Sequence, residues 1–239
     1  MNQLTPEQIT SVKAKGFLRN RGTDLFSGRV VVAGGVYTAE QLTQIAECAR
    51  LYGNGKVAFT SRLSAEIVGI PFDNIPKACD YLKKLGSGLA FGGTGAKVRP
   101  ITACKGTTCV FGCCDTQEIA AQLHQRYYIG WDAVKLPHKF KIAVGGCPNS
   151  CMKPSLNDLG IEARRKQKEV LFQLYVGGTW GRKTRPGTPL SRLVTDEELF
   201  PIVDKLLEWF QQNAPTKERL GATIDRVGME SLEKALFGQ

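Results

Sequence analysis

The chain has 239 residues, of which 42% are hydrophobic and 23% charged, and its formal net charge is +10 at pH 7. A chain of this size can bury a full core, as one large domain or two small ones. Its opening residues are polar, and the absence of an apolar run suited to a signal peptide or membrane span predicts a cytoplasmic protein without membrane contact. The positive charges are spread along the chain, whereas a nucleic-acid interface has a clustered basic face with stacking aromatics. We therefore expect the charge to serve an anionic cofactor, a small anionic substrate or an acidic partner protein.

The first part of the chain has the order of elements expected of an α+β unit, in which helices cover one face of an antiparallel sheet. Residues 38–53 repeat apolar side chains with helical spacing, and Thr38 has the hydroxyl typical of a helix N-cap. Cys48 and Cys79 lie in helical patterns, so we expect both to pack in a core. The glycines within 86–95 indicate a flexible hinge. In chain order we predict a polar helix at the N-terminus, a strand at 29–35, a helix at 38–53, strands at 56–62 and 65–70, and a helix at 73–86.

The rest of the chain also alternates between strands and helices and ends in amphipathic helices. A charged run between the last two strands is most simply a solvated hairpin turn. We predict strands at 98–102, 140–144, 158–163 and 170–176, and helices at 115–128, 196–212 and 228–237.

Six of the eight cysteines lie in two short segments, at 104–114 and 147–151. Disulfides seldom persist in the cytosol, so these thiols indicate metal or redox chemistry. Each segment follows a predicted strand, and two parallel strand ends would bring the segments together. The spacings suit structural zinc as well as an iron–sulfur cluster, and a cysteine pair could also be a redox couple.

The segment Cys147-Pro148-Asn149-Ser150-Cys151 predicts the first turn of a short helix, because Pro148 suits the first helical position. Gly145 and Gly146 would let the backbone bend tightly before it. Residues at i and i+4 share one helix face, so both thiols could bind the same metal centre. The unpaired amides of a helix N-terminus would also lower the thiol pKa values.

Basic residues near the cysteines form a candidate anion site. Lys139 and Lys141 alternate along a predicted strand, so both side chains point to one face, where they could bind an oxyanion and donate protons. Arg62 and Arg99 offer planar forks for the oxygens of a carboxylate or a small oxyanion. The two histidines have other expected roles: His138 as an exposed structural or incidental residue, and His124 as a surface residue.

Two segments, ITACKGTTCVFGCCDT and LPHKFKIAVGGCPNSC, resemble the siroheme and 4Fe–4S signature of the sulfite and nitrite reductase family. VAFTSRLSAEIVGIP resembles the ferredoxin-like half-domain of that family, and ERLGATIDRVG the C-terminal segment of its short members. The linked series, in this order, covers most of the chain. The resemblance implies an N-terminal helical segment (1–25), a ferredoxin-like half-domain (26–95), an α/β siroheme and 4Fe–4S module (96–190) and a C-terminal helical segment (191–239).

The same resemblance assigns roles to individual residues. The implied cluster ligands are Cys104, Cys109, Cys147 and Cys151. Cys151 would also bridge the cluster to the siroheme iron. The implied cations for sulfite and for the siroheme carboxylates are Arg62, Arg99, Lys139 and Lys141, and the further residues expected at the cofactor are Thr102 and Asn149.

The activity implied is reduction of sulfite to sulfide, or of nitrite to ammonia, with electrons from an external donor such as a ferredoxin. The large enzymes of the family contain the half-domain and the siroheme module twice, whereas this chain has one copy. It would therefore build its site alone or as a homodimer. Two alternatives stay open: an iron–sulfur electron-transfer protein without siroheme, and a zinc-stabilised binding module.

Overall fold

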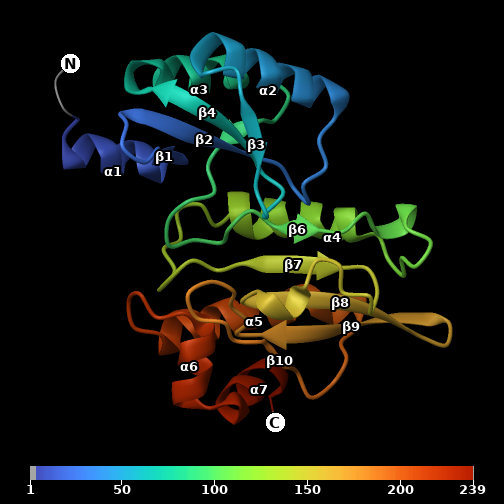
Figure 1. Cartoon of the computed structure of the whole chain (residues 1–239). Coiled ribbons are helices and arrows are strands. Elements are labelled where there is room, and N and C mark those ends of the chain that lie inside the picture. The colour runs from blue at the N-terminus through green and yellow to red at the C-terminus, as the bar shows by residue number, and fades with distance from the viewer. Residues whose placement is uncertain (1–3, 239) are drawn as a thin grey trace. The chain divides into compact units, whose positions relative to one another are not determined.

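The computed structural model describes residues 4–238, which form two compact units divided between Gly95 and Ala96 (Figure 1). Each unit has a hydrophobic core of its own, so each is described by itself. None of the helices within residues 4–238 is long and apolar enough to cross a membrane.

The first unit is an antiparallel sheet with helices packed on it (Figure 1). Its strands lie in the order β1-β2-β4-β3, and β5 pairs with β2. Helix α2 contacts α3 and β4, and the core between them contains Phe26, Ile45 and Ile67, all fully buried. This arrangement confirms the α+β class. The elements are α1 (Pro6–Ala14), β1 (Phe17–Arg19), β2 (Leu25–Val31), α2 (Ala39–Tyr52), β3 (Val57–Phe59), β4 (Ala65–Pro71), α3 (Ile75–Lys84) and β5 (Ala90–Phe91).

Local sequence explains most of this unit. The Thr38 hydroxyl accepts a hydrogen bond from the Gln41 backbone N–H, and the Gln41 side chain accepts one from the Thr38 N–H, which confirms the predicted cap of α2. Cys48 is fully buried, and burial raises the pKa of its thiol to about 12, as expected of a packing residue. The predicted hinge is partly ordered into the sheet, because the ring of Phe91 packs on Phe17 with 4.6 Å between centroids.

The second unit is a mixed five-stranded sheet in the order β10-β9-β8-β7-β6. Strands β6, β7 and β8 are parallel, while β9 pairs antiparallel with β8, and β10 pairs antiparallel with β9 at the edge. Helix α4 contacts β6 and β7, while α5 contacts β9 and α7 (Figure 1). The elements are β6 (Thr102–Ala103), α4 (Thr116–Leu123), β7 (Ile142–Gly145), β8 (Leu159–Lys166), β9 (Glu169–Val176), β10 (Thr188–Pro189), α5 (Asp196–Asn213), α6 (Leu220–Val227) and α7 (Met229–Phe237).

Several elements of this unit differ from the sequence-based expectation. The predicted strand at 98–102 is reduced to an isolated bridge between Val98 and Phe140 and the short β6, because Pro100 has no N–H for a ladder. The predicted helix at 115–128 is α-helical only over α4 and continues as a π-helix, His124–Ile129. Helix α6 was not predicted.

Candidate functional site

Two parallel strand ends bring the two cysteine segments together. Strand β6 pairs with β7 in the register Ala103↔Val144, and the Cys104 N–H donates to the Val144 carbonyl at 3.1 Å. The chain after β7 then directs the Gly146 N–H to the Cys104 sulfur, with 3.2 Å between N and Sγ. This hydrogen bond fixes the Cys104 sulfur against the backbone of the second cysteine segment. The parallel pairing is the one expected from the sequence.

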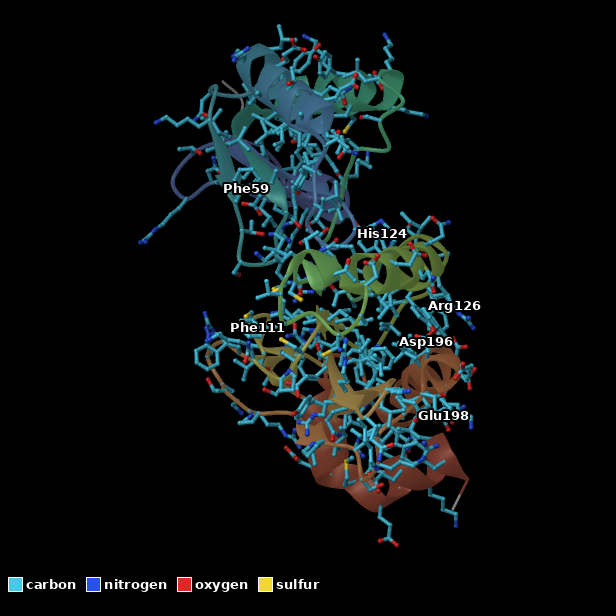
Figure 2. The ribbon with its side chains drawn as sticks, turned by 90° about the vertical axis from the view of Figure 1, so that its right-hand side faces the viewer. Phe59, Phe111, His124, Arg126, Asp196 and Glu198 are labelled. Carbon is cyan, nitrogen blue, oxygen red and sulfur yellow. The ribbon has the colours of Figure 1, made fainter. Side chains whose placement is uncertain are left out.

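The loop that carries Cys109 closes back onto the second cysteine segment. The Cys113 N–H donates to the Gly146 carbonyl at 2.8 Å, and the Gly112 N–H donates to the Cys109 carbonyl at 2.9 Å. A Cβ at Gly112 would lie 2.1 Å from the Gly106 carbonyl oxygen, so only glycine fits there. Phe111 lies in this loop, and its side chain is 63% exposed (Figure 2).

The first turn of α4 fixes the backbone of Cys104. Asp115 caps the helix by accepting hydrogen bonds from the next turn. Thr116 Oγ1 and Gln117 Nε2 then donate to the Cys104 carbonyl at 2.6 and 2.7 Å. Two side chains of one helix therefore hold the residue that leads β6 into the cysteine loop.

The segment from Cys147 to Cys151 is not helical, which corrects the prediction of a short helix there. It forms turns, and the backbone is left-handed at Ser150 (φ +56°) and again at Lys153 (φ +47°). Asn and Ser favour turns through their own side-chain hydrogen bonds, and this preference outweighs the signal from Pro148. The two thiols therefore do not share a helix face.

The glycines before this segment also have a different role from the one expected. Neither Gly145 nor Gly146 has φ in the left-handed region. Gly145 ends strand β7, whereas a Cβ at Gly146 would lie 3.3 Å from the Cys104 sulfur and 3.1 Å from Thr116 Cγ2. Gly146 is thus needed for the close approach of the two cysteine segments.

The donor set suits a cluster of iron and sulfur. Three of the four expected ligands are half-buried, Cys151 is exposed, and all four are free thiols: Cys104, Cys109, Cys147 and Cys151. Within residues 4–238 no three Cys, His, Asp or Glu side chains are arranged to hold a metal ion. The hydrogen bonds thus bring the two cysteine segments together, but the thiols themselves do not point to a common centre. Four thiols on segments tied by hydrogen bonds, with an N–H directed at one sulfur, fit the chemistry of a 4Fe–4S centre.

The remaining cysteine of interest, Cys114, is a packing residue. Burial raises the pKa of its thiol to about 12, so it stays protonated at neutral pH. It packs against the core of the second unit.

The basic residues form one face at the opposite end of the parallel strands. The Arg99 N–H donates to the Phe140 carbonyl at 2.7 Å, beside the bridge that joins Val98 to Phe140. Val98 and Phe140 are buried, so alternation turns their neighbours, Arg99, Lys139 and Lys141, to the other face. We call these three residues the cationic face. Burial lowers the pKa of Lys139, and the positive charges of Arg219 and Arg99 lower it further.

The cationic face and the cysteines are separated by the length of β7. Lys141 precedes the strand and Cys147 follows it, so their backbones are roughly 15–20 Å apart at about 3.3 Å per residue. The sequence prediction placed both sets at one site, and within one copy of the second unit they lie at opposite ends of the same strands.

Asp158 and Arg219 belong to the cationic end and were not predicted. The Asp158 side chain is 1% exposed and accepts three hydrogen bonds from Arg219, at 2.7 to 3.1 Å. Its Oδ2 also accepts the Lys141 N–H at 2.8 Å. The only sequence signal was an acidic residue directly before an apolar strand, with Arg219 in the C-terminal segment already noted.

The other predicted residues have these places. Thr102 is buried, and its hydroxyl donates to the Ile142 carbonyl at 3.4 Å, whereas Asn149 is exposed in a turn. Arg62 belongs to the first unit, where its N–H donates to the Thr60 hydroxyl in the turn between β3 and β4. His138 is half-buried rather than exposed, and its Nδ1 accepts the N–H of the following lysine at 2.7 Å.

His124 was expected on the surface and is half-buried, with its ring stacked on Tyr128 at 4.6 Å between centroids. It lies at the junction of α4 and the π-helix and not among the cysteines (Figure 2).

Comparison with known sequences decides which family has this arrangement. A family model described as the nitrite and sulphite reductase 4Fe-4S domain matches residues 94–238. The chain belongs to this family. A second model, the nitrite/sulfite reductase ferredoxin-like half domain, matches residues 19–85. Family membership supports the two cofactors expected from the sequence, a 4Fe–4S cluster and siroheme.

Relatives of this family include both nitrite and sulfite reductases. The chain is 29% identical over 204 residues to a nitrite reductase (NAD(P)H) of Bacillus subtilis, covering 85% of this chain and 24% of the relative. It is 32% identical over 237 residues to an assimilatory ferredoxin-dependent nitrite reductase of Haloferax mediterranei, covering 88% and 39%. It is 26% identical over 205 residues to an assimilatory-type sulfite reductase of Nitratidesulfovibrio vulgaris, covering 85% and 88%. The chain thus spans less than half of the first two relatives.

A solved structure has the same fold. The NirA protein of Mycobacterium tuberculosis matches with a TM-score of 0.82 at 17% identity, covering 98% of this chain and 46% of that one. This match confirms the ferredoxin-like half-domain followed by an α/β module as the fold.

Proposed function

We propose that this chain is a reductase of a small oxyanion, sulfite or nitrite, that depends on a 4Fe–4S cluster and siroheme. The observation that carries the proposal is the pairing of the two cysteine segments through Gly146 and Cys104, at the end of parallel strands. Family membership supports it. Sulfite is our first choice because this chain covers 88% of the length of the sulfite reductase of N. vulgaris, against 24% and 39% of the two nitrite reductases named above.

We assign the cluster to Cys104, Cys109, Cys147 and Cys151, whose thiols must turn toward one another to hold it. Cys151, the exposed member, is the sulfur that would be shared with the siroheme iron. Together these cofactors supply single electrons to the oxyanion. The chain itself supplies the four cysteine ligands and the Gly146 N–H that is directed at the sulfur of Cys104.

The cationic face has two tasks in this proposal. Its ammonium and guanidinium groups bind anionic oxygens, either of the substrate or of siroheme carboxylates. Lys139 has a lowered pKa, so it gives up a proton more readily than an ordinary lysine and suits protonation of a leaving oxygen. Arg62 is a further candidate cation, contributed by the first unit.

The distance along β7 between the cationic face and the cysteines indicates whether one chain or two chains form the site. Cations roughly 15–20 Å from the cysteines are too far away to hold a substrate at an iron that Cys151 ligates. We propose that two copies pair so that the cationic face of one serves the cysteine end of the other, as an isologous dimer allows.

A complementation experiment tests this pairing. Chains with Cys147→Ser and chains with Lys141→Gln are each expected to be inactive, and a mixture unfolded and refolded together should recover about a quarter of wild-type activity by random pairing of an isologous dimer. A mixture of Cys147→Ser with Cys104→Ser is the control and should recover nothing. If the mixture of Cys147→Ser with Lys141→Gln recovered no more activity than the control mixture, the site would not be shared between two chains.

Electrons must come from outside the chain in this proposal. A ferredoxin is our candidate donor, because the relative from H. mediterranei is named as ferredoxin-dependent. Eight cysteines without a disulfide among the described residues suit the reducing cytoplasm, which is where we place the reaction.

The alternatives predict different colours. A cluster carrier without siroheme would show only a broad brown absorption, and a zinc module would show none. Reduced methyl viologen as electron source, with sulfite or nitrite as substrate, identifies the oxyanion directly.

A further inference from the structure

Asp158 connects two cations of the second unit in one hydrogen-bonded group. It receives Nε and Nη2 of Arg219 on its Oδ1, at 3.1 and 2.8 Å, and Nη2 also reaches Oδ2 at 2.7 Å. Oδ2 receives the backbone N–H of Lys141 at 2.8 Å. A side chain 61 residues away in sequence is thereby fixed to the strand that carries the cationic face.

The bonds to Asp158 determine which edge of Arg219 is left for another group. A guanidinium has two edges suited to paired hydrogen bonds, one made by Nε and Nη2 and the other by Nη1 and Nη2. Asp158 takes the first edge. The second edge has the geometry that binds a carboxylate or an oxyanion with two parallel hydrogen bonds.

Asp158 places Arg219 beside the cationic face, because its Oδ2 accepts from both the Arg219 guanidinium and the Lys141 N–H. After burial, Arg219 is the group that most lowers the pKa of Lys139, ahead of Arg99, while Asp158 acts in the opposite direction. Arg219 also lowers the pKa of His138. Like charges held this close favour an anion between them.

A purely structural role explains less. The C-terminal segment is already tied to the sheet by the Lys217 N–H, which donates to the Pro137 carbonyl at 2.8 Å, and by the fully buried Leu220. A buried ion pair is also a weak source of stability, because desolvation offsets most of the attraction. The pair is therefore not required as a tether.

We propose that Arg219 is an additional anion-binding residue of the cationic face, and that Asp158 is the positioning residue that sets the direction of Arg219 and of the Lys141 backbone. The identity of the anion, sulfite or a siroheme carboxylate, rests on the proposed function. The placement of Arg219 in an anion site does not.

The test measures equilibrium binding of sulfite and of inorganic phosphate to the cofactor-loaded protein by calorimetry. Arg219→Gln should weaken binding by about 10- to 100-fold, as expected for a hydrogen bond between charged groups. Arg219→Lys keeps the charge and should recover part of the affinity. Arg226→Gln is the matched control, because Arg226 lies in α6, the helix that Arg219 precedes, and its half-exposed side chain is paired with Glu218, so this variant should bind as wild type.

A second readout separates positioning from folding. The charged groups acting on Lys139 are Arg219, Arg99 and Asp158. Removing Arg219 raises the pKa of Lys139, so the loss of anion binding at alkaline pH should move to higher pH in Arg219→Gln. Asp158→Asn should weaken anion binding while the circular dichroism spectrum remains that of the wild type. If Asp158→Asn does not fold, the comparison of Arg219→Gln with Arg219→Lys tests the inference instead.

The outcomes distinguish this inference from the proposed function. Unchanged anion affinity in folded Arg219→Gln, together with reduced affinity in Lys141→Gln, would overturn the role of Arg219 and leave the reductase intact. Phosphate binding that depends on Arg219 in a protein without tetrapyrrole or turnover would support the anion site and overturn the reductase.

Discussion

Gly146 donates its backbone N–H to the sulfur of Cys104 at 3.2 Å, and no side chain could be added at Gly146 without pressing on that sulfur. The bond joins the end of β7 to the end of β6, so it is the point where the two cysteine segments meet. The thiol environment of the proposed cluster is therefore set by backbone groups.

Gly146→Ala should impair cluster assembly. The new Cβ would lie 3.3 Å from the Cys104 sulfur and 3.1 Å from Thr116 Cγ2, so one of them must shift, at a cost of about 1–3 kcal/mol. We expect less iron and acid-labile sulfide per chain after anaerobic reconstitution. Gly145→Ala is the control, since its Cβ would meet Pro154 Cγ at an ordinary 3.6 Å. Equal cluster content in both variants would refute the close-approach role.

The sequence predicted those parts of the structure that depend on neighbouring residues. The cap of α2 by Thr38 needs only Gln41, three residues on, and the hairpin between β8 and β9 needs only its charged turn, where Gln167 is left-handed. The segment after Cys147 shows the limit of such signals. Pro148 suits a helix start, yet turn-forming neighbours decide the local backbone.

Contacts between distant residues could not be predicted. Arg219 and Asp158 are 61 residues apart, and only the folded sheet brings them together. The position of the cationic face depends likewise on the strand direction, because parallel pairing puts both sets of cations at one end and both cysteine segments at the other. Residue types alone indicated what the chain binds and not how far apart its groups lie.

Asp158→Ala should destabilise the second unit. Removing the carboxylate leaves the Arg219 charge and the Lys141 N–H buried without it, which costs about 3–5 kcal/mol for a broken buried pair. All three tryptophans, Trp131, Trp180 and Trp209, belong to this unit, so their fluorescence in urea reports its unfolding alone. Asp225→Ala, which removes a more exposed partner of Arg185, should cost about 1 kcal/mol or less.

As the pH rises, anion binding should be lost at a lower pH than it would be if Lys139 had the pKa of an ordinary lysine. Burial, Arg219 and Arg99 all disfavour the charged form of Lys139, so the pKa is lowered and the ammonium is present at neutral pH and lost as pH rises through that lowered pKa. Lys139→Arg should remove the alkaline loss, because arginine stays charged. Sulfite affinity measured from neutral to alkaline pH checks this. The same alkaline loss in Lys139→Arg would assign it to another group.

Glu198 should stabilise α5 in a pH-dependent way. Hydrogen bonds from Arg192 and from the Thr195 N–H lower the pKa of Glu198 to about 2. The lowered pKa means that its contribution is fully present above the ordinary value of 4.5 and is lost as pH falls toward about 2.

Glu198→Gln should therefore reduce the free energy of unfolding at neutral pH by up to about 1 kcal/mol, as for a partly exposed ion pair. The difference from wild type should shrink as the pH falls below 4.5, measured by urea unfolding of the tryptophan signal. Glu169→Gln, on the exposed β8–β9 hairpin, is the control. A difference that stays constant with pH would show that the charge is not involved.

The absorption spectrum of the anaerobically prepared protein tests most directly whether this chain holds a 4Fe–4S cluster and siroheme together. We predict tetrapyrrole bands toward the red on top of the broad cluster absorption in the wild type, with both lost or strongly reduced in Cys151→Ser and both retained in Cys79→Ser. A brown protein with cluster and no tetrapyrrole, or a colourless protein containing zinc, would contradict the account.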